Sequence, residues 1–282
     1  MPERRSKATA LTGLAVGAIA LVLIAAGNGH GTPRPQPAFT LPPPLRFSFG
    51  VARQEREARA IERVLSYTPY IAVGSPRRRD VALTFDDGPG PYTHAILRVL
   101  RAEHAPATFF VVGRQVPFYP DLVKLEQREG FVVGDHTEDH SYLAKLRPRD
   151  QHSEIQDAAD AIATAGAPWP HLFRPPYGSF DAHTLALLRR GRMLMTLWSV
   201  DTRDFARPGT KAILAAARAG ARPGAILLLH DGGGERSQTV AALPKIIRML
   251  RHSHLHLVTV PRLILDDPPP RDQPKPRSLS GG

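Results

Sequence analysis

The chain has 282 residues, of which 42% are hydrophobic and 22% charged, with a net charge of +11 and no cysteine. This length is typical of one domain with a large core, and the lack of Cys excludes disulfides and thiolate metal sites, so a bound metal must be held by His and carboxylate groups. The charge is compatible with a nucleic acid, an anionic membrane or an anionic extracellular polymer as partner, or with a solvated basic surface that has no specific partner.

The N-terminus has the pattern of a membrane anchor. Three basic residues in the segment 1–7 precede an uncharged apolar stretch over residues 8–27. About 20 such residues suffice to cross a bilayer, whereas the apolar part of a cleaved signal peptide usually has ~7 to 15. The charges place residues 1–7 in the cytoplasm and the rest outside the cell. We therefore predict a single-pass membrane protein, or a secreted one if the segment is cleaved, and exclude nucleic acid as the natural partner.

Three further segments flank the main domain. Residues 28–46 are rich in Pro, which predicts an extended linker, and residues 47–78 predict a helical extension because apolar side chains recur at helical spacing between Val51 and Tyr67. Residues 79–265 form the main domain. Residues 266–282 are polar and Pro-rich, and we expect this tail to be disordered.

Strand-like and helix-like segments alternate through the main domain. The predicted strands cover residues 81–85, 108–112, 131–133, a short segment near 172, 194–200, 225–229 and 257–260. The predicted helices cover residues 93–103, 121–129, 149–165, 182–190, 210–219 and 240–250. This order, without hairpin signals, predicts an α/β fold with a parallel sheet, either closed as a barrel or open and doubly wound.

Five short segments place acidic, His, Arg, Gly or Pro residues where predicted strands end. They are Thr84–Pro89, His136–His140, Arg174–Gly178, Asp201–Phe205 and Leu228–Asp231. In a barrel of alternating strands and helices, the loops at the carboxyl ends of the strands build the active site. Each segment alone is compatible with an ordinary turn or a solvated surface. Their recurrence at five strand ends makes a metalloenzyme the leading hypothesis.

Two of these segments carry candidate metal ligands and a candidate base. Asp86 and Asp87 precede a Gly-Pro turn that would let both carboxylates reach one cleft, so that one ligates a metal while the other acts as a base. His136 and His140 stand four residues apart and would project from one face of a helix. Asp135 has the place of the N-cap of that helix.

The other segments carry candidate catalytic and binding groups. Arg174 could orient a carboxylate, and the prolines after it leave the Tyr177 N–H as a donor on a stiff loop, which suits an oxyanion site. His230 ends a buried strand, and a carboxylate beside it would favour the charged ring that a general acid requires. Asp204 is the candidate for that carboxylate.

Taken in order, these segments resemble the polysaccharide deacetylases of the NodB-homology type, carbohydrate esterase family 4. The family pattern is TFDDGP, HxxxH, RxPY, DxxDW and LxH, and the match runs from about residue 79 to 263 with order and spacing intact. The resemblance implies a distorted (β/α)7 barrel, similar to a TIM barrel, and a divalent metal, usually zinc.

The resemblance also implies a role for each residue. Asp87, His136 and His140 are the implied metal ligands, Asp86 the base and His230 the acid. Arg174 is implied to orient Asp86, Asp204 to tune His230, and the Tyr177 N–H to stabilise the oxyanion. Leu228 and Trp198 are implied to line an acetyl pocket. Phe205 stands where the family usually has Trp, which keeps an aromatic wall but loses the indole N–H.

The function implied by the resemblance is hydrolysis of N-acetyl groups on an amino-sugar polysaccharide, with cell-wall peptidoglycan or a chitin-like oligosaccharide as substrate. Two alternatives stay open. The first is an acetyl-ester hydrolase that acts on a xylan-type glycan with the same site. The second is a non-catalytic wall-binding module, which would be expected to lack at least one of the ligands, the base or the acid.

Overall fold

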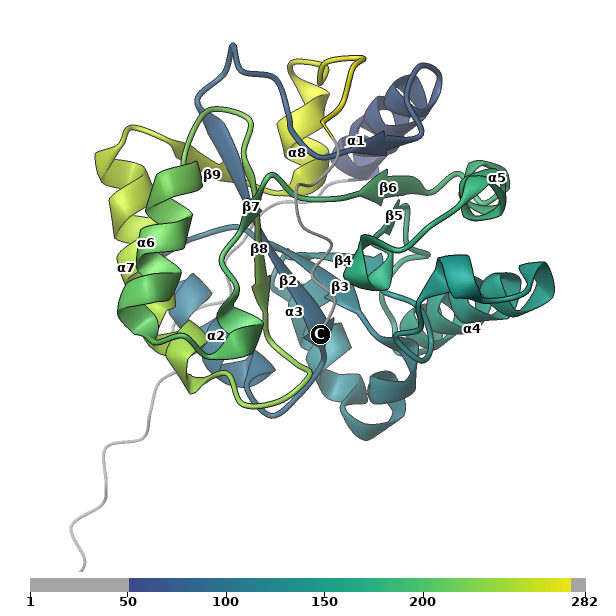
Figure 1. The fold of residues 1–282 in the computed structure, drawn as a ribbon, viewed down its shortest axis with the longest axis horizontal. Helices are drawn as coiled ribbons and strands as arrows, with labels where there is room; N and C mark the ends of the chain where they lie inside the picture. Colours follow the sequence, from purple (N-terminus) through teal and green to yellow (C-terminus); the bar gives the residue numbers. More distant parts are fainter. Residues whose placement is uncertain (1–50, 275–282) are drawn as a thin grey trace, which may run out of the picture. The chain divides into compact units, whose positions relative to one another are not determined.

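The computed structural model describes residues 51–274, and a curled parallel sheet wrapped by helices forms the centre of this part of the chain (Figure 1). The order of strands across the sheet is β1-β6-β5-β4-β3-β2-β8-β7, and β9 also pairs with β2. The strands are β1 Tyr70–Ile71, β2 Asp80–Gly88, β3 Thr108–Val111, β4 Val132–Asp135, β5 Leu172–Phe173, β6 Leu194–Thr196, β7 Val200–Asp201, β8 Ile226–His230 and β9 His256–Val258.

All pairings between these strands are parallel, as the sequence predicts. The predicted strand over residues 194–200 is wrong in one respect, because it divides into β6 and β7, which lie near opposite ends of the strand order. Only three residues separate β6 from β7 in the chain, although the two strands lie near opposite edges of the sheet. Such a short connection requires the sheet to curl until its edges approach each other. The fold is therefore a half-barrel.

The helices agree with the predicted segments, with one addition and one exception. They are α1 Val51–Leu65, α2 Thr93–Ala102, α3 Pro120–Arg128, α4 Pro148–Thr164, α5 Ala182–Arg190, α6 Thr210–Gly220, α7 Ser237–His252 and α8 Val260–Leu265. Neither α8 nor the short strand β1 was expected. The predicted helix from His136 is absent, and this segment is a loop. None of the helices between residues 51 and 274 has the length and apolar character that crossing a bilayer requires, and the predicted anchor at 8–27 and linker at 28–46 lie outside the described residues.

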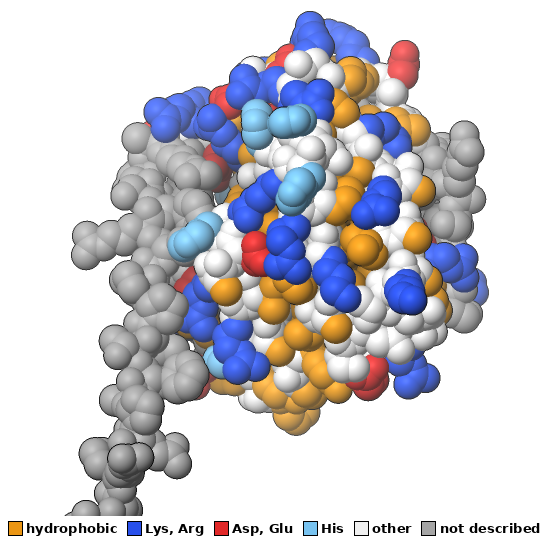
Figure 2. Space-filling view, turned by 90° about the vertical axis from the view of Figure 1, so that its left-hand side faces the viewer, with side chains coloured by type: hydrophobic (Ala, Val, Ile, Leu, Met, Phe, Trp, Pro, Cys, Tyr) orange, Lys and Arg blue, Asp and Glu red, His pale blue; other side chains and the backbone are white. Residues whose placement is uncertain are grey.

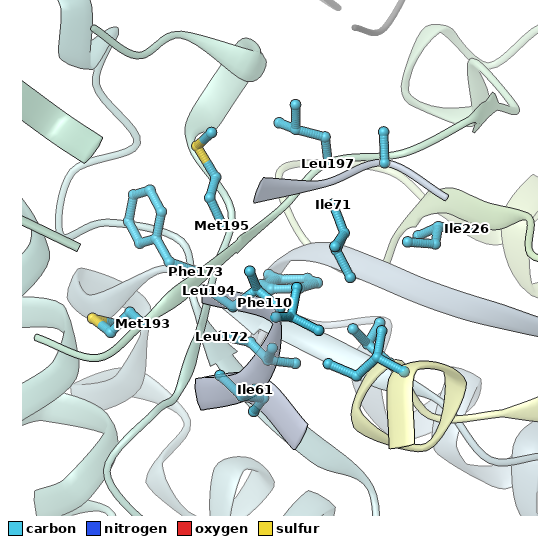
Figure 3. Packing of buried hydrophobic residues seen from close by; sticks show 14 of the residues in the cluster. Ile61, Ile71, Phe110, Leu172, Phe173, Met193, Leu194, Met195, Leu197 and Ile226 are labelled. Carbon is cyan, nitrogen blue, oxygen red and sulfur yellow. The ribbon is translucent and has the colours of Figure 1, made fainter. Parts of the chain in front are cut away.

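Successive side chains of a strand point to opposite faces of the sheet, and this alternation produces two separate hydrophobic clusters. Leu83 and Phe85 of β2 pack outward in a cluster that includes residues of α2, α6 and α7. The cluster inside the half-barrel includes Ala82, Ile71 and Ile61, and Figure 3 shows Ile61 of α1 close to Leu172. Because side chains alternate along a strand, Asp86 points to the same side as Ala82. The helix α1, which lies within the predicted helical extension, contributes Ala60, Ile61 and Val64 to this inner cluster.

The basic residues are spread over the surface. The helices α6 and α7 contain no acidic residue. Figure 2 shows Lys and Arg on this side as separate spots between neutral and apolar side chains. Arg248 and Arg251 of α7 are paired with Glu103. On this face of the described residues (Figure 2), the basic side chains do not form the continuous track that a nucleic acid would follow.

The segment after α8 is bound to the domain, which differs from the disorder expected for residues 266–282. The Oε1 atom of Gln273 accepts hydrogen bonds from the N–H groups of Ala72 and Val73 at 2.8 and 3.0 Å. The Tyr70 hydroxyl donates to the Gln273 carbonyl, and Arg77 pairs with Asp267 at 2.6 Å. Side-chain hydrogen bonds thus fasten residues 266–274, an interaction that composition alone does not predict. Residues 275–282 lie outside the described part.

Helix α3 carries a carboxyl group that is fully buried and makes no hydrogen bond within residues 51–274. Glu126 has 0% of its surface exposed, and neither of its carboxyl oxygens has a hydrogen-bond partner among the described residues. Burial, together with the charge of the buried Asp231, raises the pKa of Glu126 well above its usual value. The folded protein therefore keeps this group protonated at a pH where the unfolded chain releases the proton.

We expect Glu126→Met to increase the free energy of unfolding by about 1–3 kcal/mol at pH 8. The wild-type protein loses stability as the pH rises above ~4.3, where the unfolded carboxyl ionises, so the gain should be smaller at pH 5. Urea unfolding at both pH values measures the effect, and Lys124→Met on the exposed face of α3 is the control. Destabilisation by Glu126→Met at pH 8 would show that the carboxyl group has a stabilising role.

Candidate metal centre and active site

Asp86 and Asp87 end the central strand β2 and reach the same pocket. The pairing of β2 with β3 shifts register between Asp86 and Gly88, and Asp87 has a left-handed φ of 71°. Such an irregularity at a strand end redirects a side chain that would otherwise point to the opposite side. The structure thus confirms that both carboxylates face one cleft.

Asp87, His136 and His140 converge on one point. The Oδ1 atom of Asp87 lies 3.0 Å from Nε2 of His140 and 3.5 Å from Nε2 of His136. This buried Oδ1 atom accepts no hydrogen bond of normal geometry within residues 51–274. Burial opposes ionisation of Asp87, but the neighbouring imidazoles outweigh it and hold its pKa well below the usual value. A charged carboxylate beside two ring nitrogens is a donor set that fits a divalent metal ion.

A loop, rather than the expected helix, brings the two histidines together. The Asp135 carboxylate accepts a hydrogen bond from the Thr137 N–H at 2.7 Å, and Thr137 and His140 have left-handed φ values of 66° and 60°. The Asp side chain thus stabilises a tight turn at this place. The spacing of four residues was a correct indication of a shared site, although the helical explanation for it was wrong.

The outer nitrogens of both rings are fixed by other groups. His136 Nδ1 lies 2.6 Å from the Arg174 carbonyl oxygen, which can only accept, so Nδ1 carries a proton and Nε2 is the ring nitrogen that faces Asp87. His140 Nδ1 lies 3.0 Å from the Tyr177 hydroxyl. The ring of Tyr177 in turn stacks on Tyr142. Contacts of this kind orient metal-binding imidazoles.

Arg174 connects the metal centre to the candidate base. Its side chain has 0% exposure, and its Nη1 atom donates to Asp86 and to Thr84, each at 2.7 Å. The other guanidinium nitrogens donate to the carbonyls of Thr196 and Leu197. The predicted contact between Arg174 and Asp86 is therefore present.

His230 lies beside Asp86, because these two residues are partners in the register of β2 and β8. The Asp204 carboxylate accepts from His230 Nδ1 at 2.7 Å, from the His230 N–H at 2.9 Å and from the Thr239 hydroxyl at 2.7 Å. Burial alone would favour the neutral ring, but the charge of Asp204 raises the pKa of His230 to about 9. His230 is therefore protonated at neutral pH, as the sequence-based hypothesis requires.

Asp204→Asn should lower the pKa of His230 by about 2 units or more, because it removes the closest opposing charge. The protonated ring persists below pH 9 in the wild-type protein, so the variant should lose that proton at a lower pH. NMR titration of the His230 ring measures the change. Asp201→Asn, which changes a nearby carboxylate that does not contact His230 Nδ1, should have a smaller effect; an unchanged pKa in Asp204→Asn would contradict the assignment.

These groups surround a pocket of about 330 Å³. Tyr177, Trp198, Phe205 and Leu228, all expected from the sequence, line it together with the two aspartates and three histidines. The Phe205 ring lies at 70° to that of His230, with 5.6 Å between ring centroids. Arg174 and Asp204 do not line the pocket but contact Asp86 and His230, which do.

Sequence analysis missed several residues at the pocket. Arg114 and Gln115 belong to the 3₁₀ helix η1 Gly113–Phe118, which follows β3 directly. Applying the strand-end argument to the predicted strand 108–112 would have found them. Arg236 also lines the pocket. Its guanidinium group donates hydrogen bonds to the carbonyls of Gly232 and Gly233, and these bonds stabilise the glycine-rich turn after β8.

Comparison with known proteins gives a consistent result. The family model for polysaccharide deacetylases matches residues 74–194. A chitooligosaccharide deacetylase of Bradyrhizobium sp. is 40% identical, over 66% of this chain and 90% of that protein. A peptidoglycan-N-acetylglucosamine deacetylase of Bacillus cereus is 37% identical, over 72% of this chain and 97% of that protein.

Solved structures share the fold. The crystal structure of a peptidoglycan N-acetylglucosamine deacetylase with a bound benzamide ligand has a TM-score of 0.68 and 31% identity, covering 71% of this chain and 94% of the other. A carbohydrate esterase family 4 pseudoenzyme from Bacillus anthracis has a TM-score of 0.65 and 28% identity, covering 69% of this chain and 68% of the other. The fold alone therefore does not establish activity, and the residues of the site must be considered individually.

Proposed function

Because the chain belongs to the polysaccharide deacetylase family, we propose that it is a metal-dependent enzyme that removes N-acetyl groups from cell-wall peptidoglycan, at its N-acetylglucosamine or N-acetylmuramic acid units, or from a chitin-like oligosaccharide. One observation carries this proposal. An oriented carboxylate, a three-residue donor set and a protonated histidine border the same pocket, whereas each would be dispensable in a protein that only binds glycans.

Zinc is the metal we propose for the centre. Catalytic zinc sites commonly have three protein ligands, drawn from His and carboxylate groups, and leave a position open. Asp87, His136 and His140 fit this set, and their side chains lie between the pocket and the residues that orient them. When bound, the metal would acidify a water molecule and stabilise negative charge on the acetyl oxygen.

Asp86 is the proposed base. It takes a proton from the water molecule that attacks the acetyl carbon, and Arg174 holds its carboxylate in place at 2.7 Å. The Tyr177 N–H is proposed to stabilise the oxyanion, since Tyr177 lines the pocket with a left-handed backbone at φ 59°.

His230 is the proposed acid. It gives its proton to the departing amine while the C–N bond breaks, and the products are acetate and a free amino sugar. Asp204 keeps the ring protonated until this step. Leu228 and Trp198 are proposed to enclose the acetyl methyl group, and Phe205 to contact the sugar.

We also propose that the enzyme acts outside the cell, either anchored in the membrane by residues 8–27 or secreted after cleavage of that segment. The apolar stretch and the charges before it support this location. Separation of membrane, wall and culture-medium fractions tests it. Recovery of the protein in the cytosol would contradict it.

The decisive experiment uses the full chain, stripped of metal and reloaded with zinc. The protein is incubated with N-acetylglucosamine oligomers and with purified peptidoglycan, and the released acetate is measured. We expect acetate that depends on zinc from at least one substrate. Absence of acetate from both, with zinc bound, would contradict the proposed activity on amides.

Two alternatives are separated by the same assay. Release of acetate from acetylated xylan but from no N-acetylated glycan would identify an acetyl-ester hydrolase. Full zinc binding without release from any substrate would identify a wall-binding module. The complete set of ligands, base and acid favours the enzyme over that module.

A further inference from the structure

An exposed aromatic residue lies in η1, the short helix whose Arg114 and Gln115 line the pocket, and it has no role in the mechanism above. Phe118 is the last residue of η1 and has 74% of its surface exposed. Trp169, at 38%, is the other exposed large hydrophobic residue among those described, and it lines a separate cavity with residues of α1 and β4. A single exposed apolar side chain is common on protein surfaces, so a role for Phe118 has to be argued from its position.

The geometry of η1 places Phe118 on the same side of this helix as Gln115, which lines the pocket. In a 3₁₀ helix, residues three apart are eclipsed. Gly113 and Val116 follow this rule, because both are buried. Gln115, which lines the pocket, is therefore eclipsed with Phe118. The rise of ~2.0 Å per residue places Phe118 about 6 Å further along the helix than Gln115.

We propose that Gln115 and Phe118 form a second sugar-binding subsite, which holds the unit of the glycan next to the one being deacetylated. This inference rests on the proposed function, since it assigns a neighbour to the sugar in the same pocket. A sugar ring presents C–H groups on its face and hydroxyl groups on its edge. The Phe118 ring fits the face, and the amide of Gln115 fits the hydroxyl groups.

The surroundings favour a glycan over a protein partner. A stable protein interface buries ~800 Å² on each partner, with a cluster of apolar anchors. Phe118 is instead one of two exposed large hydrophobic side chains among the described residues, and the other, Trp169, lines a separate cavity. One aromatic ring matches the size of one sugar unit, and its place in a helix that borders the pocket matches a polymer that continues beyond the reacting unit.

The first test compares kcat/KM for N-acetylglucosamine itself, which has one unit, and for its hexamer. We expect Phe118→Ala to lower the value for the hexamer about 3- to 10-fold, mainly through KM, and to leave the value for the single unit, which has no neighbour to occupy the subsite, unchanged. Phe118→Tyr should keep the wild-type values, as should Trp169→Ala at the separate cavity. An equal loss for both lengths, or no loss for the hexamer, would overturn the subsite while leaving the proposed activity intact.

The second test measures binding without turnover. Titration calorimetry of the hexamer uses the Asp86→Asn protein with and without Phe118→Ala. We expect Phe118→Ala to weaken binding and so to raise the dissociation constant about 3- to 10-fold. This test applies even if no glycan releases acetate, in which case the proposed function fails separately. An unchanged dissociation constant, or no binding of the hexamer to either protein, would overturn the subsite.

Discussion

Asp86→Asn should reduce kcat for deacetylation by about 10²- to 10⁴-fold and leave zinc binding intact. Asn has nearly the same shape as Asp and can still accept a hydrogen bond from Arg174, so the pocket should keep its form. Its amide oxygen, however, cannot act as a base at neutral pH. Acetate release and the zinc content of the same preparation measure the two properties together.

The matched control for this prediction is Asp87→Asn, one residue further along the chain. It changes the same chemical group but belongs to the donor set, so it should lose zinc as well as turnover. The difference in zinc content between the two variants distinguishes the residue that acts as the base from the one that binds the metal. A near-normal rate in Asp86→Asn would mean that another group takes the proton.

His136→Ala should weaken zinc binding by more than about 100-fold and abolish turnover at ordinary zinc concentrations. Loss of a group that only orients a ligand typically costs 10–100-fold in metal affinity, and loss of the ligand itself should cost more. The two remaining groups, Asp87 and His140, supply too few donors for a tight site. Competition with a chelator of known affinity measures the change.

His183→Ala is the control, because His183 lies in α5 and does not line the pocket. It should bind zinc as tightly as the wild-type protein does. Circular dichroism of His136→Ala tests whether the fold is retained. Wild-type zinc affinity in a folded His136→Ala protein would show that the metal binds elsewhere.

The sequence was informative about the site because its chemistry lies at strand ends. Asp86 and His230 each follow a run of apolar residues, and parallel strands bring their carboxyl ends to one edge. The register of β2 with β8 then places the two side by side. An ionisable residue at the end of an apolar run can be recognised from the amino-acid sequence alone, so this part of the site could be predicted.

The local geometry of the loops could not be predicted in the same way. The pattern Asp135 to Glu138 resembles a helix start, yet Asp135 stabilises a turn and His140 has a left-handed backbone. The hydrogen bond between the Tyr177 hydroxyl and His140 Nδ1 depends on two loops that meet only in the folded protein. The division of residues 194–200 into β6 and β7 likewise depends on closure of the sheet, which no local pattern encodes.

The contacts of Gln273 have a practical consequence for protein production. A truncated protein ending at Leu265, the predicted domain boundary, would leave the N–H groups of Ala72 and Val73 without their acceptor. Unpaired amides next to a short terminal strand favour association with other chains. Low yield or aggregation of such a truncated protein would then reflect the missing residues 266–274, and a weak acetate signal from it would be mistaken for poor catalysis.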